Sequence, residues 1–147
     1  MRLSRFIALV LTCSVLLAGC SESPQWRLNS GEAQSLKDVN GQWLLFNYWA
    51  EWCAPCIKEI PELNELDEAH DITVYGYNFD RLQGDKLTEQ ASKLGIAFAL
   101  MRDEPAPIFG QATPKGLPAT LVVTPQGEVQ EWLIGPQTVE SVRAVLQ

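Results

Sequence analysis

The sequence contains few of the residues from which metal and nucleic-acid sites are made. It has one histidine and four cysteines, and 18 acidic residues outnumber 11 basic residues. The resulting formal charge of −7 disfavours binding to nucleic-acid phosphates and to anionic lipid head groups. A structural zinc site needs four ligands, mostly cysteine and histidine, and beyond the cysteines at 53 and 56 the sequence after residue 20 offers only His70. We therefore expect neither a bound metal nor a nucleic-acid partner.

The sequence also lacks an apolar segment that is long enough to cross a membrane. Its most apolar run, from residue 6 to residue 18, has 13 residues, whereas a spanning helix needs about 20. The run follows a short basic start that contains Arg2 and Arg5, and it ends in the sequence Leu-Ala-Gly-Cys at residues 17–20. A basic start and a short apolar run that ends in small residues are typical of an export signal that is removed.

The residues at 17–20 resemble a bacterial lipobox, in which the cysteine becomes the lipidated first residue of the mature protein. On this interpretation residues 1–19 are a signal peptide that takes Cys13 with it, Cys20 carries acyl chains, and residues 20–25 are a polar tether. Several acyl chains hold a protein on a membrane stably, whereas one chain does not. The alternative is an ordinary signal peptide that leaves Cys20 unmodified.

The rest of the chain has the size and composition of one globular domain, which we assign to residues 26–147. Removal of residues 1–19 leaves 128 residues and takes the formal charge from −7 to −9. A chain of this length can bury a proper core. With 46% hydrophobic and 20% charged residues, the composition is that of a folded protein rather than a disordered one.

The strongest motif is the sequence Cys-Ala-Pro-Cys at positions 53–56. An apolar run at 43–49 predicts a buried strand before it, and residues 54–70 predict a helix after it, so that Cys53 lies at a helix N-terminus. Unpaired backbone N–H groups and the helix dipole favour a thiolate there, and the spacing allows a disulfide within one turn. The motif therefore predicts a reversible dithiol/disulfide pair. A passive structural disulfide is the alternative.

Hydrophobic periodicity and turn residues predict that strands and helices alternate and that a hairpin follows near the C-terminus. We expect strands at 43–49, 72–77, 97–101, 119–123 and 128–134, helices at 54–70, 82–94 and 137–146, and an N-terminal hairpin around residues 30–31. Residues 103–114, which contain three prolines, should be irregular with one turn near Ile108. This order predicts an α/β fold in which helices flank a central mixed β-sheet.

Two segments of the chain carry a family resemblance. The first is Tyr-Trp-Ala-Glu-Trp-Cys-Ala-Pro-Cys at 48–56, together with Pro61, and the second is Gly-Leu-Pro-Ala-Thr at 116–120. With some sixty residues between the cysteine pair and the second segment, they resemble a thioredoxin fold. The resemblance covers residues 26–147 and implies both the fold and thiol chemistry.

Three further features resemble the membrane-tethered, extracytoplasmic thioredoxin-like proteins of the TlpA/ResA/DsbE type more closely than thioredoxin itself. Asn47 stands where thioredoxin usually has an aspartate, and Glu59 stands three residues after the second cysteine. Residues 80–102 add a helix and a strand between the cysteine half and the proline half. We therefore expect an inserted helix and strand in the sheet region.

The resemblance implies different roles for the two cysteines. Cys53 is expected to be the outer, exposed thiol, which attacks a disulfide and forms the first mixed disulfide, and Cys56 is expected to be the resolving thiol one turn deeper. The redox-active pair is the only redox group implied, without a further cofactor. Haem attachment would need a histidine directly after the second cysteine, where this chain has Ile57.

Glu59 is the candidate proton acceptor for this chemistry. It lies one helical turn after Cys56 and shares a helix face with it. Asn47 cannot perform the proton relay attributed to the aspartate of thioredoxin, so this role is either missing or taken over by Glu59. A partly buried carboxylate could also tune the reduction potential of the pair. The alternative is a solvated glutamate on the helix surface.

Four residues are expected to form the substrate-binding surface, namely Trp52, Pro55, Leu117 and Pro118. The resemblance implies a cis peptide bond before Pro118, next to the disulfide, where a backbone edge can accept an extended substrate as an added strand. Leu117 would shape that edge, and Trp52 would form an exposed apolar lip beside Cys53. The alternatives are an ordinary loop proline at 118 and a packed core aromatic residue at 52.

Together these features predict an extracytoplasmic thiol-disulfide oxidoreductase that is lipid-anchored on the cell envelope and faces the periplasm. The resemblance favours a reductase of protein disulfides, with apocytochrome c in cytochrome c maturation as the leading substrate and a membrane or soluble thiol reductant as electron donor. A reductase is also favoured because nothing resembles an added dimerisation or chaperone domain, and we expect a monomer. A disulfide-forming oxidase and a non-catalytic lipoprotein that binds a partner remain as alternatives, since the potentials of related pairs span about 150 mV.

Mass spectrometry of the mature protein tests the expected lipid anchor. We predict a diacyl or triacyl mass on an N-terminal Cys20, because the lipobox-like sequence directly follows a short export signal. A Cys20→Ser variant should lose this mass and leave the membrane fraction. A mature protein that begins at Ser21, or one that retains Arg2, would contradict the prediction.

Overall fold

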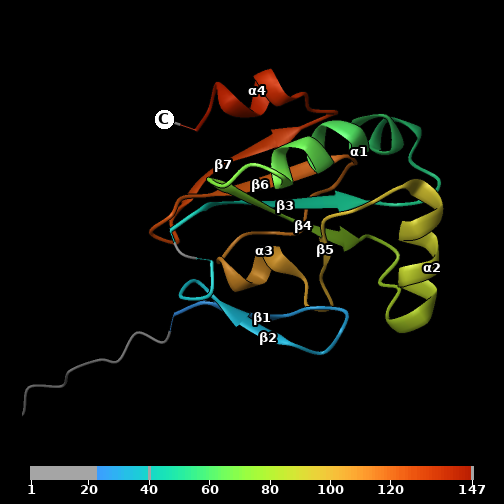
Figure 1. The fold of residues 1–147 in the computed structure, drawn as a ribbon, viewed down its shortest axis with the longest axis horizontal. Helices are drawn as coiled ribbons and strands as arrows, with labels where there is room; N and C mark the ends of the chain where they lie inside the picture. The colour runs from blue at the N-terminus through green and yellow to red at the C-terminus, as the bar shows by residue number, and fades with distance from the viewer. Residues whose placement is uncertain (1–22, 40, 147) are drawn as a thin grey trace, which may run out of the picture.

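The computed structural model describes residues 23–39 and 41–146 (Figure 1). Cys20, the expected signal peptide and the first half of the expected tether lie outside the described residues. Within the described part of the chain, no helix is both long and apolar enough to span a membrane. The first strand begins at Gln25, one residue before the expected start of the domain.

A five-stranded mixed sheet forms the centre of the domain, as the sequence predicts. Its strands are β3 (Trp43–Trp49), β4 (Ile72–Asn78), β5 (Ala99–Leu100), β6 (Ala119–Val123) and β7 (Val129–Ile134), in the spatial order β5-β4-β3-β6-β7. β3 pairs in parallel with β4 and antiparallel with β6, while β4 and β5 are parallel and β6 and β7 antiparallel. β3 is almost fully buried, because both faces of a central strand are covered.

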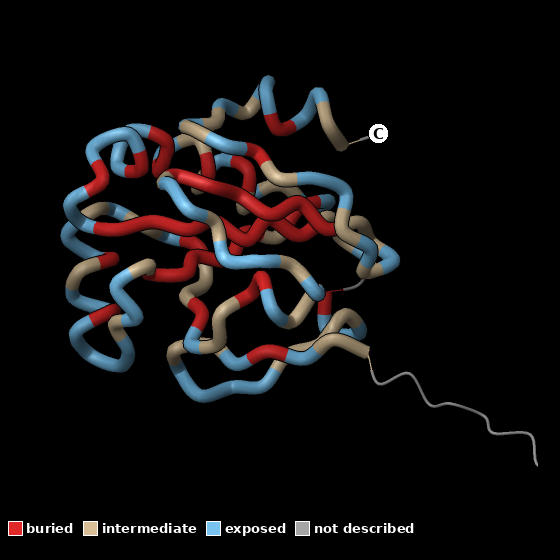
Figure 2. The backbone as a smooth tube through the Cα atoms, turned by 180° about the vertical axis from the view of Figure 1, so that it is seen from behind, coloured by how far each residue is buried: buried red, intermediate tan, exposed pale blue. Residues whose placement is uncertain are grey.

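Helices and a hairpin cover the two faces of this sheet, and the buried residues gather between these layers (Figure 2). The elements are α1 (Ala54–Asp67), α2 (Gly84–Leu94), α3 (Pro105–Ile108), α4 (Val139–Arg143) and the hairpin of β1 (Gln25–Arg27) and β2 (Ala33–Ser35). α1 and α4 lie on one face, and α3 and the hairpin lie on the other (Figure 1). On the hairpin face, Trp26 packs edge-on against Phe46 and Tyr75, with ring centroids 5.7 and 5.5 Å apart.

The two helices on the α1 face are shorter than the sequence predicts. α1 ends three residues earlier, because the chain turns there to bring the start of β4 next to β3. α4 begins two residues later and ends three residues earlier than expected. Its start is delayed because Thr138 caps the helix, while the N–H of Gln137 donates to the carboxylate of Glu59 instead.

The strand β5 also differs from the prediction. The strand expected at 97–101 is reduced to two residues, because the N–H of Ala97 donates to a side chain of α1 (2.9 Å) and not to a strand. In the segment 103–114, the turn expected near Ile108 is the four-residue helix α3, which ends at that residue. The N–H of Ala106 in α3 donates to the hydroxyl of Tyr48 at 2.9 Å, which fixes this helix to β3.

Gly76 in β4 marks close packing next to the end of β3. A β-carbon at this position would lie 2.8 Å from the ring of Phe98 and 3.0 Å from Nε1 of Trp49. Both aromatic side chains are buried, so neither can move aside without disturbing the core around it. The strand therefore requires a residue without a side chain at this position.

The substitution Gly76→Ala should lower the free energy of unfolding by about 1–3 kcal/mol, the usual cost of overpacking a core. Urea unfolding of the oxidised protein measures this change. Gly116→Ala is the matched control, because a β-carbon there would meet no atom within 4 Å, and it should change the free energy by less than about 0.5 kcal/mol. Equal effects of the two substitutions would argue against close packing at Gly76.

Candidate functional site

The cysteine pair lies where β3 passes into α1. After β3, the chain makes a turn in which the N–H of Cys53 donates to the carbonyl of Ala50 (3.1 Å). Cys53 is the N-cap of α1, and Pro55 lies in the first turn of the helix, where backbone N–H groups have no intrahelical partner and a proline is tolerated. The structure thus confirms that Cys53 lies at a helix N-terminus.

Cys53 and Cys56 form a disulfide, with their Cα atoms 5.3 Å apart. The N–H of Cys56 donates to Sγ of Cys53 at 3.3 Å, so the helix start places a donor on the sulfur that is expected to attack. The expectation of an openly exposed Cys53 is wrong for the oxidised protein, because Cys53 is only 4% exposed and Cys56 1%. Both pack in one cluster with Trp49 and the partly buried Leu117.

Trp52 is an exposed apolar lip and not a packed core residue, with 65% of its surface accessible. Its Nε1–H group donates to both carboxylate oxygens of Asp80, at 3.2 and 3.0 Å. Its ring meets that of Phe79 edge-on, with centroids 6.5 Å apart. Residues 79–80 directly follow β4, so the ends of two neighbouring parallel strands hold this side chain. Pro55 is exposed as well.

A chain of amide and carboxylate side chains ties the turn before Cys53 to α2. Gln90 of α2 donates through Nε2 to Glu51 (2.8 Å) and accepts through Oε1 from Asn78 (2.9 Å). Asn78 is buried at the end of β4, and its Oδ1 accepts from the N–H of Leu82 (3.2 Å). The inserted helix therefore helps to fix the turn in front of the cysteine pair.

Glu59 is buried, only 2% exposed, and not solvated on the helix surface. Its Oε1 accepts from Nδ2 of Asn47 at 2.8 Å, and its Oε2 accepts from the backbone N–H of Gln137 at 2.7 Å. The Asn47 amide also donates to the hydroxyl of Thr120 at 3.0 Å. Groups from β3, β6 and the β7–α4 connection therefore meet around this carboxylate, one helical turn from Cys56.

Burial raises the pKa of Glu59 to about 7 from an ordinary 4.5, while the hydrogen bonds from Gln137 and Asn47 act in the opposite direction. The folded protein therefore binds this proton more tightly than the unfolded chain. The resulting stabilisation is fully present below about pH 4.5 and is lost as the pH rises to about 7. A carboxyl group that titrates near neutral pH is suited to exchange a proton with a thiol.

Pro118 follows a cis peptide bond with Leu117, as the resemblance implies. It is buried, whereas Leu117 is half-buried and packs in the cluster of the cysteine pair. β6 begins directly after it, where Ala119 pairs with Tyr48 of β3. The carbonyl of Pro118 accepts from the N–H of Gly135 at 2.9 Å. The expected proline therefore lies at the end of β3 from which the cysteine turn starts.

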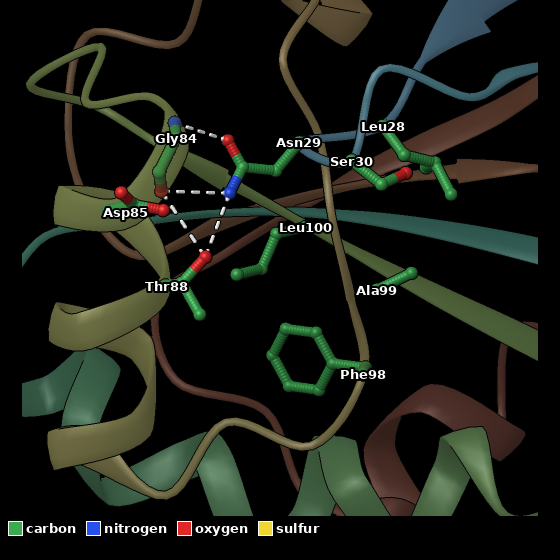
Figure 3. Close-up of a pocket in the computed structure, with 9 residues that line it drawn as sticks. All are labelled: Leu28, Asn29, Ser30, Gly84, Asp85, Thr88, Phe98, Ala99 and Leu100. Carbon is green, nitrogen blue, oxygen red and sulfur yellow. Dashed lines mark hydrogen bonds between the residues drawn. The ribbon is translucent and has the colours of Figure 1, made fainter.

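A cleft of about 550 Å³ lies between the hairpin loop and α2, and none of the predicted site residues line it (Figure 3). Phe98 and Leu100 form part of its wall. At its rim, Oδ1 of Asn29 accepts from the N–H of Gly84 (2.6 Å), and its Nδ2 donates to the carbonyl of Gly84 and the hydroxyl of Thr88, both at 3.0 Å. Asn29 thus occupies the N-terminus of α2, and we assign no chemistry to the cleft.

Sequence reasoning missed three residues of the site, namely Asp80, Thr120 and Gln137. Asp80 had a detectable signal, since it follows β4 at the sheet edge where the cysteine turn begins. Gln137 had none, because only its backbone takes part.

Within residues 23–39 and 41–146, no three histidine, cysteine or acidic side chains cluster in a way that could hold a metal ion.

Comparison with known proteins identifies related chains. The model of the AhpC/TSA family matches residues 21–132. The chain is 33% identical over 122 residues to the thiol-disulfide oxidoreductase ResA of Bacillus cereus, an alignment that covers 80% of this chain and 69% of that protein. It is 31% identical over 130 residues to the thioredoxin-like protein YneN of Bacillus subtilis, covering 80% and 72% of the two chains.

Solved structures share the fold. The TM-score is 0.70 with a DsbF homologue from Corynebacterium diphtheriae, at 23% identity over 84% of this chain and 82% of that chain. It is 0.61 with StoA from Bacillus subtilis, at 21% identity over 82% and 93% of the two chains. These matches confirm the predicted fold, and with the family match they show that the chain belongs to the AhpC/TSA family and has a thioredoxin-like fold.

Proposed function

We propose that this protein is an extracytoplasmic thiol-disulfide oxidoreductase that reduces protein disulfides through Cys53 and Cys56. The observation that carries the proposal is a disulfide at a helix N-terminus with a buried carboxyl group, whose pKa burial raises, one helical turn further along. A passive structural disulfide would need neither feature. The relative named as a thiol-disulfide oxidoreductase supports the same chemistry.

In the proposed reaction, the thiolate of reduced Cys53 attacks one sulfur of a substrate disulfide. A mixed disulfide forms, and the other substrate sulfur leaves as a thiolate. Cys56 gives its proton to Glu59 and attacks Sγ of Cys53, which releases the first substrate sulfur and restores the Cys53–Cys56 disulfide. Two electrons pass to the substrate, whose thiolates take up protons. A thiol reductant, in the membrane or soluble, then reduces the pair again.

The surface around the pair fits an extended protein segment. Leu117, which packs in the cluster of the disulfide, and the adjacent Pro118 would form an edge where such a segment pairs with the backbone as an added strand. An apolar substrate side chain would rest against Trp52, which is exposed and held by Asp80. Pro55, exposed in the first turn of α1, would complete this surface.

The reducing direction and the substrate class rest on the resemblance to the TlpA/ResA/DsbE type. It supports a lipoprotein anchored through Cys20, which keeps the haem-binding thiols of apocytochrome c reduced. An oxidase would run the same steps in reverse. A titration of the pair against glutathione measures the reduction potential, which separates the two directions.

Trapping experiments should distinguish the two cysteines. The Cys56→Ser variant should accumulate mixed disulfides with its substrates, because the attacking thiol remains and the resolving thiol is gone. The Cys53→Ser variant should trap almost none. Mass spectrometry of non-reduced complexes, with insulin as the probe substrate, measures both. Equal trapping would overturn the assignment, and a wild-type protein unable to reduce insulin would favour a non-catalytic lipoprotein.

The Glu59→Gln variant should fold and titrate its thiols at lower pH, because a nearby carboxylate disfavours a thiolate. It should reduce insulin at least about tenfold more slowly, since the resolving step loses its proton acceptor. Its free energy of unfolding should no longer fall as the pH rises from 4.5 to about 7. Thiolate absorbance against pH, steady-state reduction and urea unfolding at several pH values measure these three effects.

Glu65→Gln is the matched control for this variant. Glu65 lies further along α1, where its side chain is exposed. The substitution removes one negative charge from the same helix and leaves Glu59 in place, so its thiol titration and turnover should match those of the wild type. If the Glu59→Gln curves also superimpose on those of the wild type, the proton passes through water instead.

A further inference from the structure

The connection between β7 and α4 contacts two parts of the site. The backbone N–H of Gln137 donates to Oε2 of Glu59 at 2.7 Å. Two residues earlier, the N–H of Gly135 donates to the carbonyl of Pro118 at 2.9 Å. One short segment therefore links the buried carboxylate to the expected substrate edge.

This connection is fixed along its length. Nε2 of Gln137 donates back to the carbonyl of Gly135 at 2.8 Å. Thr138 then begins α4 with a capping box, in which it exchanges hydrogen bonds with Ser141. The N–H of Val139 donates to Glu62 of α1. A segment held by hydrogen bonds on both sides can place a single N–H group with little freedom.

We propose that residues 135–137 form a positioning element of the reaction, in which the N–H of Gln137 holds the Glu59 carboxylate for proton transfer and Gly135 ties the same segment to Pro118. The inference rests on the proposed role of Glu59 as proton acceptor. Gln137 acts through Glu59, so the backbone donor matters and the identity of the side chain matters little.

The surroundings of Glu59 make this donor important. Asn47 on β3 donates to its carboxylate and also to the hydroxyl of Thr120 on β6, while Cys56 and Glu62 lie three residues before and after it on α1. Within the described residues no charged side chain contributes to the pKa shift of Glu59, which burial raises and only the hydrogen bonds from Gln137 and Asn47 lower. Losing one of two hydrogen bonds to a carboxylate should therefore raise its pKa by about one unit or more.

The test removes the N–H of residue 137 and keeps its side chain. Replacing Gln137 by its α-hydroxy acid puts an ester oxygen in place of the N–H. Gln137→Pro removes the same donor genetically and serves as the second variant. Gln137→Ala is the matched control, since it keeps the donor and removes the side chain together with its hydrogen bonds to Gly135 and Ser141. The backbone bonds of Gly135, Thr138 and Val139 still hold the segment in this variant. Circular dichroism and thermal unfolding check that each variant is folded.

We expect the ester variant to raise the pKa of Glu59 by about one unit and Gln137→Ala to leave it unchanged. Carboxyl NMR against pH, with the signal assigned by Glu59→Gln, measures this shift in the oxidised protein. At pH 7 the ionised fraction would fall from about a half to about a tenth, so kcat for insulin should fall about fivefold and recover at higher pH. KM should stay the same, because Gln137 acts through Glu59.

An unchanged Glu59 titration in both donor-free variants would overturn the inference, whatever their turnover. So would an equal shift in Gln137→Ala, because the side chain would then be responsible. If the titration shifts as expected but Glu59→Gln turns over normally, the contact stands and the proposed proton role of Glu59 fails. The two failures are therefore distinguishable.

Discussion

β3 pairs with β4 over seven residues and with β6 over five, and the position of every group in the site depends on this pairing. The carboxyl ends of β3 and β4 and the amino end of β6 meet at one edge of the sheet. Three features of the site lie at that edge, namely the turn before Cys53, the contact between Trp52 and Asp80, and Pro118. A register shift of one residue would turn each side chain to the opposite face, and Asn47 would then point away from Glu59.

Glu59 differs from the other acidic groups of this acidic protein because it is buried. The protein carries a net charge of −7, and its other acidic groups lie mostly where water can solvate them. Glu59 instead receives two neutral hydrogen bonds, and no cation among the described residues contributes to its environment. Its ionisation should therefore couple to that of the cysteine one turn away, since two acids in one buried site do not ionise independently. Titrations of the reduced protein will report the pair and not either group alone.

The sequence predicted the cysteine site more completely than the other features of the structure. The spacing of Cys53 and Cys56, between an apolar run and an amphipathic helix, determined both their chemistry and their place at the helix start. The cis peptide bond before Pro118 needed the family resemblance, because loop prolines have no local signal that separates the two isomers. Helical periodicity could not decide whether Glu59 is buried, because it places Glu62, one turn later, on a neighbouring part of the same helix. The pattern therefore does not separate the two glutamates.

The errors have a common physical origin in contacts between distant segments. Periodicity predicts α4 from residue 137, but Thr138 caps the helix, and residue 137 lies in the connection before it, where its N–H contacts Glu59, 78 positions away in the chain. The two-residue length of β5 depends on Asn64, 33 positions before Ala97. Local sequence patterns contain no information about such partners, and element ends are where these contacts compete with helix and strand propensity.

The hydrogen bonds between Trp52 and Asp80 have a thermodynamic consequence for recognition. An exposed side chain normally loses rotational freedom when a partner binds, and this loss opposes association by about 0.5–1.5 kcal/mol for each immobilised side chain. The indole of Trp52 is already fixed by the carboxylate and by the ring of Phe79. Much of its ordering cost is therefore met during folding, and a protein segment that bound beside the disulfide, as proposed, would not have to immobilise this residue.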